Sequence, residues 1–195
     1  MSDNLESYAL GLDIGHSLKN FGEGLDKDAI VEGLTTVLEG GEEKISGEEV
    51  KKHLQALQAR VEGAKAEKMS GEGAAFLAEN AQRSEVKVTE SGLQYEVITE
   101  GEGAKPTAEQ TVEVNYEGKL IDGTIFDSSF QRGESISFGL NQVIKGWTEG
   151  LQLMTVGSTY NLYIPYSLGY GAQGAGQAIP PYAALVFKVE LIAIK

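Results

Sequence analysis

The sequence predicts an α+β protein, in which an all-α N-terminal part precedes a C-terminal antiparallel sheet wrapped on one short helix. Two observations support this fold class. Up to about residue 86, proline is absent and apolar residues recur at helical spacing, whereas all four prolines lie beyond that point. In the later part, apolar and polar residues alternate as in half-buried strands. We expect a helical domain at 1–45, a long connecting helix at 46–86 and a sheet domain at 87–195.

The first predicted helix has two apolar faces. One face holds Leu5, Tyr8, Leu12 and Gly15, and the other holds Leu10, Ile14, Leu18 and Phe21. A helix that is apolar on two sides must bury both of them. Gly11 and Gly15 would allow a partner backbone to come close, although glycine weakens a helix by roughly 1 kcal/mol relative to alanine.

Two further helices follow, each with recognisable end signals. Asp26 is a candidate N-cap for the second, and Gly40-Gly41 ends it. Ser46 and Glu49 form a capping box for the third, which spans about 30 residues and roughly 45 Å. The inward residues are Ile30, Gly33, Leu34, Val37 and Leu38 in the second helix and Val50, Leu54, Leu57, Val61 and Ala64 in the third.

Three thin apolar faces on fewer than 90 residues cannot easily bury themselves. A long helix with a narrow apolar stripe usually finds a partner or bridges two domains. We therefore predict that the first two helices intertwine with those of a second copy to make a homodimer. The alternative is a monomer in which the helices form a cap folded onto the C-terminal domain.

Residues 87–195 are predicted to form strands around a single helix near Trp147–Leu153. The strands are expected at Leu93–Thr99, Thr111–Leu120, Ser135–Phe138, Thr159–Ile164 and Leu185–Ile194. In the second of these, Val112, Val114 and Tyr116 alternate with polar residues, which indicates one buried face. The helix must then cover one face of the sheet, with Trp147 in its first turn.

Composition excludes several classes of function. The formal net charge of −13 disfavours nucleic acid and anionic membrane surfaces as partners. The chain has no cysteine, so disulfides, thiolate catalysis and thiolate metal sites are excluded. His16 and His53, the two histidines, have neither each other nor a cysteine nearby and are expected at a surface or interface. The first residues show no secretory signal, which predicts a cytoplasmic location.

A glycine-rich segment resembles a nucleotide site without its context. Gly169, Gly171 and Gly174 match G-x-G-x-x-G after a predicted strand. A dinucleotide site needs a helix to begin there, because the helix N-terminus holds the pyrophosphate. The chain instead continues to Pro180-Pro181, which is incompatible with a helix. These glycines are better interpreted as shaping a loop at the rim of a pocket.

Residues 114–129 and 143–147 together predict an apolar pocket with a single carboxylate. Aromatic residues surround Asp127, and neither a nucleophile nor a phosphate cradle lies nearby in the sequence. Such a pocket suits a reaction that breaks no bond, such as rotation about an X–Pro amide. Each aromatic residue taken singly is more simply a core residue. Asp127 and Arg132, likewise, could be a surface ion pair worth roughly 0–1 kcal/mol.

The last 109 residues resemble the FKBP family of peptidyl-prolyl cis-trans isomerases. The matching residues, in order, are Tyr116, Gly118, Asp122-Gly123, Phe126-Asp127-Ser128-Ser129, Arg132, Val143-Ile144, Gly146-Trp147, Gly150, Met154, Val156-Gly157, Ile164-Pro165, Gly169-Tyr170-Gly171, Ile179-Pro180-Pro181 and Leu185-Val186-Phe187-Val189-Glu190-Leu191. The N-terminal part is similar to the dimerisation domain (1–45) and connecting helix of the MIP-like bacterial subgroup.

The resemblance implies an FKBP-like fold and an isomerase site. Asp127, Tyr170, Phe126 and Ile144 would be catalytic, and Tyr116, Ile136, Phe138, Val143, Trp147, Ile179 and Phe187 would bind substrate. Trp147 would form the floor under the proline ring, while the Ile144 N–H and the Tyr170 hydroxyl would donate to substrate carbonyls. No cofactor or metal is expected. The implied partners are proline-containing unfolded or partly folded proteins, a second copy of the chain, and macrolides such as FK506 or rapamycin.

Some positions depart from the family pattern. Ile136 and Phe138 share a strand where relatives often have two aromatic residues, and Leu168 stands where some have a second tyrosine. Ala175 and Ala178 make the rim loop smaller. We expect an isomerase that accelerates proline-limited folding and whose dimer also binds clients as a chaperone does. The alternatives are a holdase that grips apolar or proline-containing segments with incidental turnover, and an assembly protein with an idle C-terminal domain.

Overall fold

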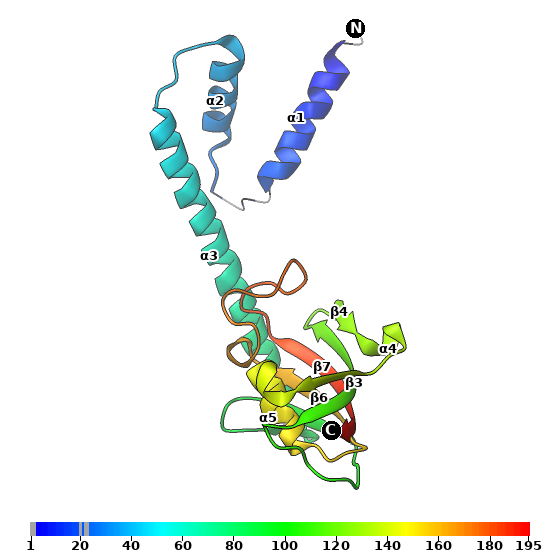
Figure 1. Ribbon diagram of the computed structural model, residues 1–195. Helices are drawn as coiled ribbons and strands as arrows, with labels where there is room; N and C mark the ends of the chain where they lie inside the picture. The colour runs from blue at the N-terminus through cyan, green and yellow to red at the C-terminus, as the bar shows by residue number, and fades with distance from the viewer. Residues whose placement is uncertain (1–2, 20, 22–23) are drawn as a thin grey trace. The chain divides into compact units, whose positions relative to one another are not determined.

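The computed structural model describes residues 3–19, 21 and 24–195, and its contacts divide the chain into two units, Met1–Lys65 and Ala66–Lys195. Figure 1 shows helices at the N-terminal end and a sheet at the C-terminal end, so the predicted α+β class is confirmed. One long helix, α3 (Gly47–Asn80), contributes its first turns to one unit and its last turns to the other.

The first unit contains α1 (Asp3–Lys19), α2 (Lys27–Glu39) and the start of α3. The Asp26 carboxylate accepts from the Asp28 N–H at 2.9 Å and caps α2, which ends at Gly40 with φ 70°. At the start of α3, Glu49 accepts from the Ser46 N–H at 2.9 Å, as the predicted capping box requires. The end signals of α2 and the start signal of α3 are therefore confirmed.

The described apolar side chains of the first unit are either exposed or only half-buried. None of the described residues between 4 and 65 is buried. Leu5 is 71% exposed, Leu10 63% and Leu38 84%. Phe21, assigned to an apolar face of the first helix, lies beyond its end at Lys19. Helices this short gain little stability from their own hydrogen bonds, so faces of this kind call for a covering surface.

The second unit is built on one seven-stranded antiparallel sheet of order β1-β2-β6-β7-β3-β4, with β5 paired to β3. The strands are β1 (Val86–Val88), β2 (Gln94–Thr99), β3 (Thr111–Leu120), β4 (Ile125–Ser128), β5 (Ile136–Gly139), β6 (Thr159–Ile164) and β7 (Leu185–Ile194). The short helices are α4 (Ser129–Arg132), η1 (Leu140–Gln142), α5 (Lys145–Leu153) and η2 (Tyr166–Leu168). The central strands β3, β6 and β7 have the bounds that the sequence predicts.

The shorter elements differ from the prediction. Neither β1 nor β4 was expected, and the expectation of a single helix in this part is wrong, because α4, η1 and η2 also form. The helix near Trp147 begins two residues earlier, at Lys145. The long helix ends at Asn80, short of residue 86, and the chain turns at 81–85 before β1. The elements that the sequence did not predict have only three or four residues each, too few for a periodic pattern to be visible.

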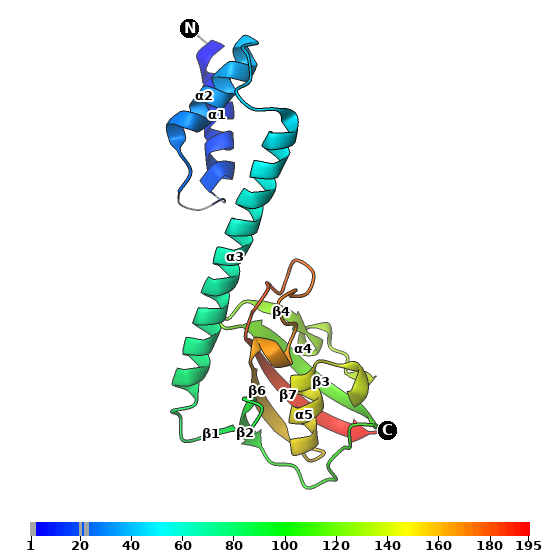
Figure 2. The ribbon, with the colours of Figure 1, turned by 90° about the vertical axis from the view of Figure 1, so that its left-hand side faces the viewer.

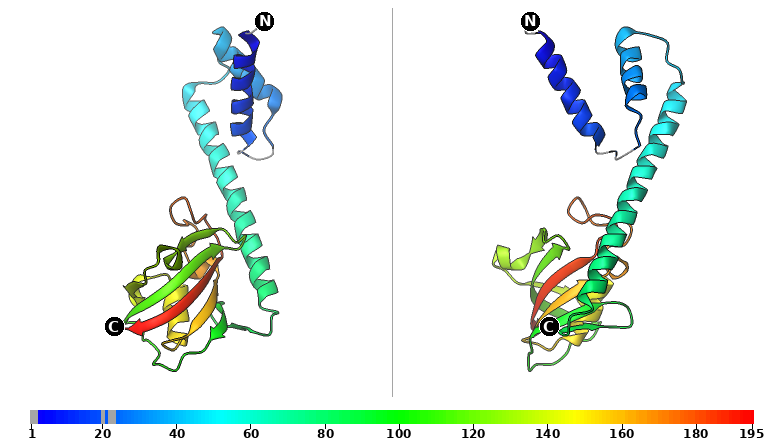
Figure 3. Two further views of the ribbon diagram at one scale, coloured as in Figure 1. Left: turned by 90° about the vertical axis from the view of Figure 1, so that its right-hand side faces the viewer. Right: turned by 180° about the vertical axis from the view of Figure 1, so that it is seen from behind.

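Helix α5 lies across one face of the sheet, as Figures 2 and 3 show from opposite sides. The core between them includes Leu151, Leu162 and Ile164, all fully buried. A Cβ on Gly146 would lie 2.6 Å from the Ile164 side chain, closer than real carbon atoms approach. Glycine at 146 therefore lets the first turn of α5 contact β6, and this contact places the next residue, Trp147.

The last turn of α3 packs on the opposite face of the same sheet. Tyr163, which alternates with the inward Leu162 and Ile164, has its ring centroid 6.1 Å from that of Phe76. The buried Asn80 side-chain amide donates to the Gln94 side-chain oxygen at 2.9 Å, and the Gln94 side-chain amide donates to the Leu77 backbone carbonyl at 2.8 Å. These contacts make the end of α3 part of the sheet unit.

A charged group completes this junction. Arg83 donates to the Tyr163 hydroxyl at 3.0 Å and to the Glu96 carboxylate at 2.7 Å. The Tyr163 hydroxyl also donates to Glu96 at 2.7 Å. Because the Glu96 side chain is only 13% exposed, these hydrogen bonds compensate for removing its charge from water.

Candidate active site

A pocket of about 460 Å³ opens between β3, β5, α5 and the loop that follows η2. This loop, residues 169–181, is called the rim loop below. The lining is mostly apolar and aromatic and contains one carboxylate. It comprises Tyr116, Phe126, Asp127, Ile136, Phe138, Gln142, Val143, Ile144, Trp147, Tyr170, Ala175, Ala178, Ile179 and Phe187.

Trp147 lies at the centre of the aromatic lining and is 5% exposed. Its ring centroid is 5.2 Å from that of Tyr116, with the planes at 83°, and 5.1 Å from that of Phe187, with the planes at 82°. Phe138 approaches it at 5.1 Å from a third side. Edge-to-face contacts of this kind hold an aromatic ring in one orientation. Its indole N–H is buried and has no hydrogen-bond partner among the described residues.

Phe126 and Phe187 form one wall of the pocket. Their ring centroids are 5.5 Å apart and their planes meet at 82°. Both rings pack over the backbone of Gly118, where an added Cβ would lie 2.6 Å from each. Only glycine at position 118 of β3 therefore leaves room for the Phe126 and Phe187 rings that form this wall.

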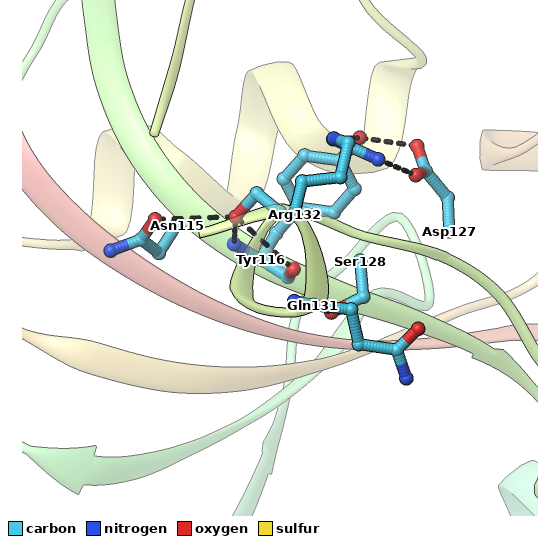
Figure 4. A network of polar contacts seen from close by, with 7 residues as sticks. Asn115, Tyr116, Asp127, Ser128, Gln131 and Arg132 are labelled. Carbon is cyan, nitrogen blue, oxygen red and sulfur yellow. Dashed lines mark hydrogen bonds and ion pairs between the residues drawn. The ribbon is translucent and has the colours of Figure 1, made fainter. Parts of the chain in front are cut away.

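The carboxylate of Asp127 is held by two neighbours, the Tyr116 hydroxyl and the Arg132 guanidinium, which both donate to it. Arg132 also donates to the Tyr116 hydroxyl at 3.2 Å, which closes a three-membered network (Figure 4). The predicted partnership of Asp127 with Arg132 is confirmed. It is more than a surface ion pair, because Tyr116, a buried residue of the pocket lining, also takes part in the network.

Electrostatics keep this network in one protonation state near neutral pH. Burial acts to raise the pKa of Asp127, but the hydrogen bonds from Tyr116 and Arg132 outweigh it and hold that pKa below its ordinary value. Burial raises the pKa of the Tyr116 hydroxyl, and its hydrogen bond to the Asp127 carboxylate raises it further. Tyr116 therefore stays a donor and Asp127 stays an acceptor.

Ser129 supports this network from behind and is fully buried. Its hydroxyl accepts from the Tyr116 N–H at 2.8 Å and donates its own hydrogen to the Asn115 side-chain oxygen at 3.3 Å (Figure 4). Asn115 in turn donates to Glu190 on β7 at 3.0 Å. The side chain of Ser129 thus takes the place of a strand partner just where the pairing of β3 with β4 ends.

The rim loop is tied to itself and closes one side of the pocket. Ala175 and Ile179 exchange two backbone hydrogen bonds, at 2.8 and 3.1 Å. Ile179 is 6% exposed, whereas Tyr170 is 40% exposed. Residues 169–184, all of them described, contain no helix, so the glycine-rich segment has no helix N-terminus with which to hold a pyrophosphate.

The structure brings together all eleven residues that the sequence assigns to the site. Their individual functions stay predictions. Gln142 was not assigned to the site, because a lone glutamine at the end of a three-residue helix gives no sequence signal. Ala175 and Ala178, noted only as small rim residues, also line the pocket. His16 and His53 are both exposed, and the described residues contain no group of side chains suited to a metal ion.

Comparison with known proteins agrees with this geometry. Residues 102–192 match the family model of FKBP-type peptidyl-prolyl cis-trans isomerases, and residues 3–97 match that of the domain amino-terminal to them. The FKBP-type 22 kDa peptidyl-prolyl cis-trans isomerase of Escherichia coli K12 is 46% identical over 96% of this chain and 93% of its own length. The chain belongs to the FKBP-type peptidyl-prolyl cis-trans isomerase family.

Other members of this family share both parts of the chain. The Legionella longbeachae outer membrane protein MIP is 40% identical over 97% of this chain and 84% of its own length. The crystal structure of FkpA from Escherichia coli aligns with a TM-score of 0.75 and 38% identity, covering 100% of this chain and 97% of that one. The resemblance to the FKBP family and its MIP-like subgroup is therefore confirmed.

As an FKBP-type protein, the chain is a peptidyl-prolyl cis-trans isomerase. The pocket described above lies within the residues that the isomerase family model covers. None of the helices in the described part of the chain is long and apolar enough to cross a membrane. The cytoplasmic location is tested by none of these findings and stays a prediction.

Proposed function

We propose that the aromatic pocket isomerises X–Pro peptide bonds by taking them out of water. Amide resonance gives such bonds a barrier of about 18–20 kcal/mol, and exchange without a catalyst takes tens to hundreds of seconds at about 25 °C. Resonance places charge on the oxygen and the nitrogen, and water stabilises that separation. The twisted transition state has lost the resonance, so a dry pocket destabilises it less than the planar ground state.

The observation that carries this proposal is the buried Trp147 ring beneath the pocket. A prolyl ring above the indole would have Phe126 and Phe187 as its wall. The Ile144 N–H and the Tyr170 hydroxyl would donate to the carbonyl groups on either side. Lowering the barrier by ~4 kcal/mol in this way would accelerate exchange roughly a thousandfold.

We assign Asp127 a positioning role in this pocket. A carboxylate that acts as a base needs a proton to take, and rotation about an amide releases none. Its two donors and its lowered pKa keep it an anionic acceptor. In that state it orients the Tyr116 hydroxyl and the Arg132 guanidinium at the pocket wall.

The test measures cis/trans exchange of a short X–Pro peptide with the full-length chain. We expect Phe126→Ala to slow exchange most and Asp127→Ala to slow it while the protein stays folded. Ile192→Ala is the matched control, because Ile192 is 36% exposed and lies outside the pocket lining. Unchanged rates in both Phe126→Ala and Asp127→Ala would contradict the site assignment.

Macrolide binding is a second expectation for the same pocket. We propose that FK506 or rapamycin competes with the peptide, because members of the FKBP family often bind these macrolides. Ile136, Leu168 and the small Ala175 and Ala178 alter the rim, so the affinity is expected to be lower than in relatives with larger rim residues. A competition series in the peptide assay measures this affinity directly.

We propose further that the first unit makes a homodimer. The exposure of Leu5, Leu10 and Leu38 leaves its apolar faces without cover within the chain. Side chains added at Gly11 and Gly15 would meet nothing within 4 Å, so a second backbone has room to approach there. Sedimentation at micromolar concentration should give twice the mass of the chain, and Leu10→Glu should reduce it to that of a single chain.

A dimer would place two pockets on one assembly and raise the effective concentration of a bound client. On this basis we propose chaperone-like client binding in addition to isomerisation. The alternative is a holdase with incidental turnover. It predicts that the Leu10→Glu and Phe126→Ala proteins suppress the aggregation of an unfolded client to the same extent. The isomerase with an added capture function predicts that Leu10→Glu loses activity only on long clients and keeps its rate on short peptides.

A further inference from the structure

Tyr182 has an unusual backbone for its residue type. Its φ is 60°, and no other described residue apart from glycine has a positive φ. The left-handed region crowds the Cβ of an L residue against the next carbonyl oxygen, so a bulky side chain adopts it only where its surroundings impose it. Such outliers concentrate at sites where the fold holds a functional segment in place.

Its surroundings are the two ends of the rim loop. The Tyr182 ring packs against that of Tyr166, with 5.3 Å between centroids and 63° between planes. The Tyr182 N–H donates to the Gly171 carbonyl at 2.9 Å, and the Gly171 N–H donates to the Tyr166 carbonyl at 2.9 Å. Tyr166 precedes the rim loop and Tyr182 follows it, so these contacts close the base of the loop.

A stiff connection runs from this closure into the pocket. Ile179, which lines the pocket, is joined to Tyr182 by Pro180 and Pro181 alone. The ring of proline fixes φ near −65°, so two consecutive prolines leave the residues on either side few positions relative to each other. On the other side of the loop, Tyr170 directly precedes Gly171, which is hydrogen-bonded to both tyrosines.

We propose that Tyr182 and Tyr166 form a lock that positions the rim loop for substrate binding. The lock holds Ile179 and Tyr170 at the pocket before substrate arrives. Neither tyrosine of the lock lines the pocket itself, so both act through the loop. Ordering the loop in advance removes an entropic cost from binding, so the lock should affect the affinity for substrate and leave the rotation step unchanged. This inference rests on the proposed function of the pocket.

The test uses full-length variants and separates binding from turnover for one short X–Pro peptide. Tyr182→Phe keeps the ring and should behave as wild type. Tyr182→Gly adopts φ 60° without difficulty but loses the ring. It should raise the peptide Kd on the order of fivefold, with the exchange rate of the bound peptide within about twofold of wild type. Tyr166→Leu should raise the peptide Kd to the same extent. The double variant Tyr166→Leu/Tyr182→Gly should bind the peptide no more weakly than either single variant, because all three proteins lose the same contact.

Tyr95→Leu is the control for losing an aromatic pair. Tyr95 stacks on Tyr160 at 5.8 Å outside the pocket lining, so its replacement should leave the peptide Kd unchanged. A Tyr182→Gly protein that binds peptide as tightly as wild type would overturn the lock. So would a fall in the bound-state exchange rate without a change in Kd. Failure of the wild type itself to accelerate exchange would instead contradict the proposed function, so the two failures can be told apart.

Discussion

The two units of this chain differ in where their apolar residues lie. In the second unit, Leu151, Leu162 and Leu191 are fully buried between sheet and helix. In the first unit, Leu5 and Leu38 project into solvent, and no described residue is buried. Buried apolar area is the main source of folding stability, at roughly 25 cal/mol per Å². The second unit therefore carries its own stability, whereas the first buries too little apolar surface to gain much from this source, as expected if the proposed homodimer forms.

The change from exposed to buried residues takes place within one helix, α3. Up to Lys65, α3 shows only exposed and half-buried residues, whereas beyond it Gly73 and Asn80 are buried against the sheet unit. A Cβ on Gly73 would lie 3.1 Å from that of Ala184, which precedes β7. A continuous helix thus belongs partly to each unit, and along this helix the two parts differ in packing while the secondary structure stays the same.

The largest expected effect is the loss of a core side chain from the second unit. Trp147 is the only tryptophan, so its fluorescence reports the unfolding of that unit. Leu162→Ala should lower the free energy of unfolding by about 2–5 kcal/mol, because it leaves a cavity at a fully buried position. Leu38→Ala, in the first unit, should change the same fluorescence transition by less than about 0.5 kcal/mol. Equal effects would remove the distinction between the units.

The next effect concerns the two ends of α3. Gln94→Leu deprives the buried Asn80 amide of its acceptor, which should cost about 1–3 kcal/mol in urea unfolding of the second unit. The matched control is Gln58→Ala, which removes a hydrogen bond to Glu62 on an exposed turn of the same helix. That variant should lie within about 0.5 kcal/mol of wild type. A large effect of Gln58→Ala would mean that the first part of α3 is packed as tightly as the last.

Dilution should separate the units without any mutation. If a second copy covers α1 and α2, a tenfold dilution should lower the stability of these helices by about 1.4 kcal/mol, as followed by helical circular dichroism. The Trp147 fluorescence transition should not move. A helical transition that is independent of concentration would favour the monomeric alternative.

The smallest expected effect is a dependence on acid that is confined to the second unit. Burial acts to raise the pKa of Glu96, but hydrogen bonds from Tyr163, Asn161 and Arg83 hold it below its ordinary value of about 4.3. A carboxyl with a lowered folded-state pKa contributes stability above its unfolded pKa, and that contribution is lost as the pH falls through the folded-state value. Glu96→Gln should therefore reduce the loss of stability below about pH 4 in the Trp147 transition. If Glu96→Gln lost as much stability in acid as the wild type, protonation of this carboxyl would not be linked to folding.

Much of this architecture can be predicted from local sequence. The long strands β3 and β7 show an alternation that has no other simple interpretation, and Asp26 and Ser46 are caps whose partners lie within three residues. The site residues were found through a family resemblance spread over the whole sheet unit. Gln142 could not be predicted as a lining residue, because no pattern in the neighbouring sequence indicates that it faces the pocket.

What the sequence determined by itself was the division into helical and strand parts, the bounds of the long strands, and the set of side chains that would meet in one pocket. Only the tertiary structure decided the short elements β1, β4 and α4, the end of α3 at Asn80 and the left-handed backbone of Tyr182. The reason is the range of the forces involved. Alternation and capping act between residues close in sequence, whereas a short strand, a helix end without a stop signal or a strained residue is stabilised by partners far along the chain.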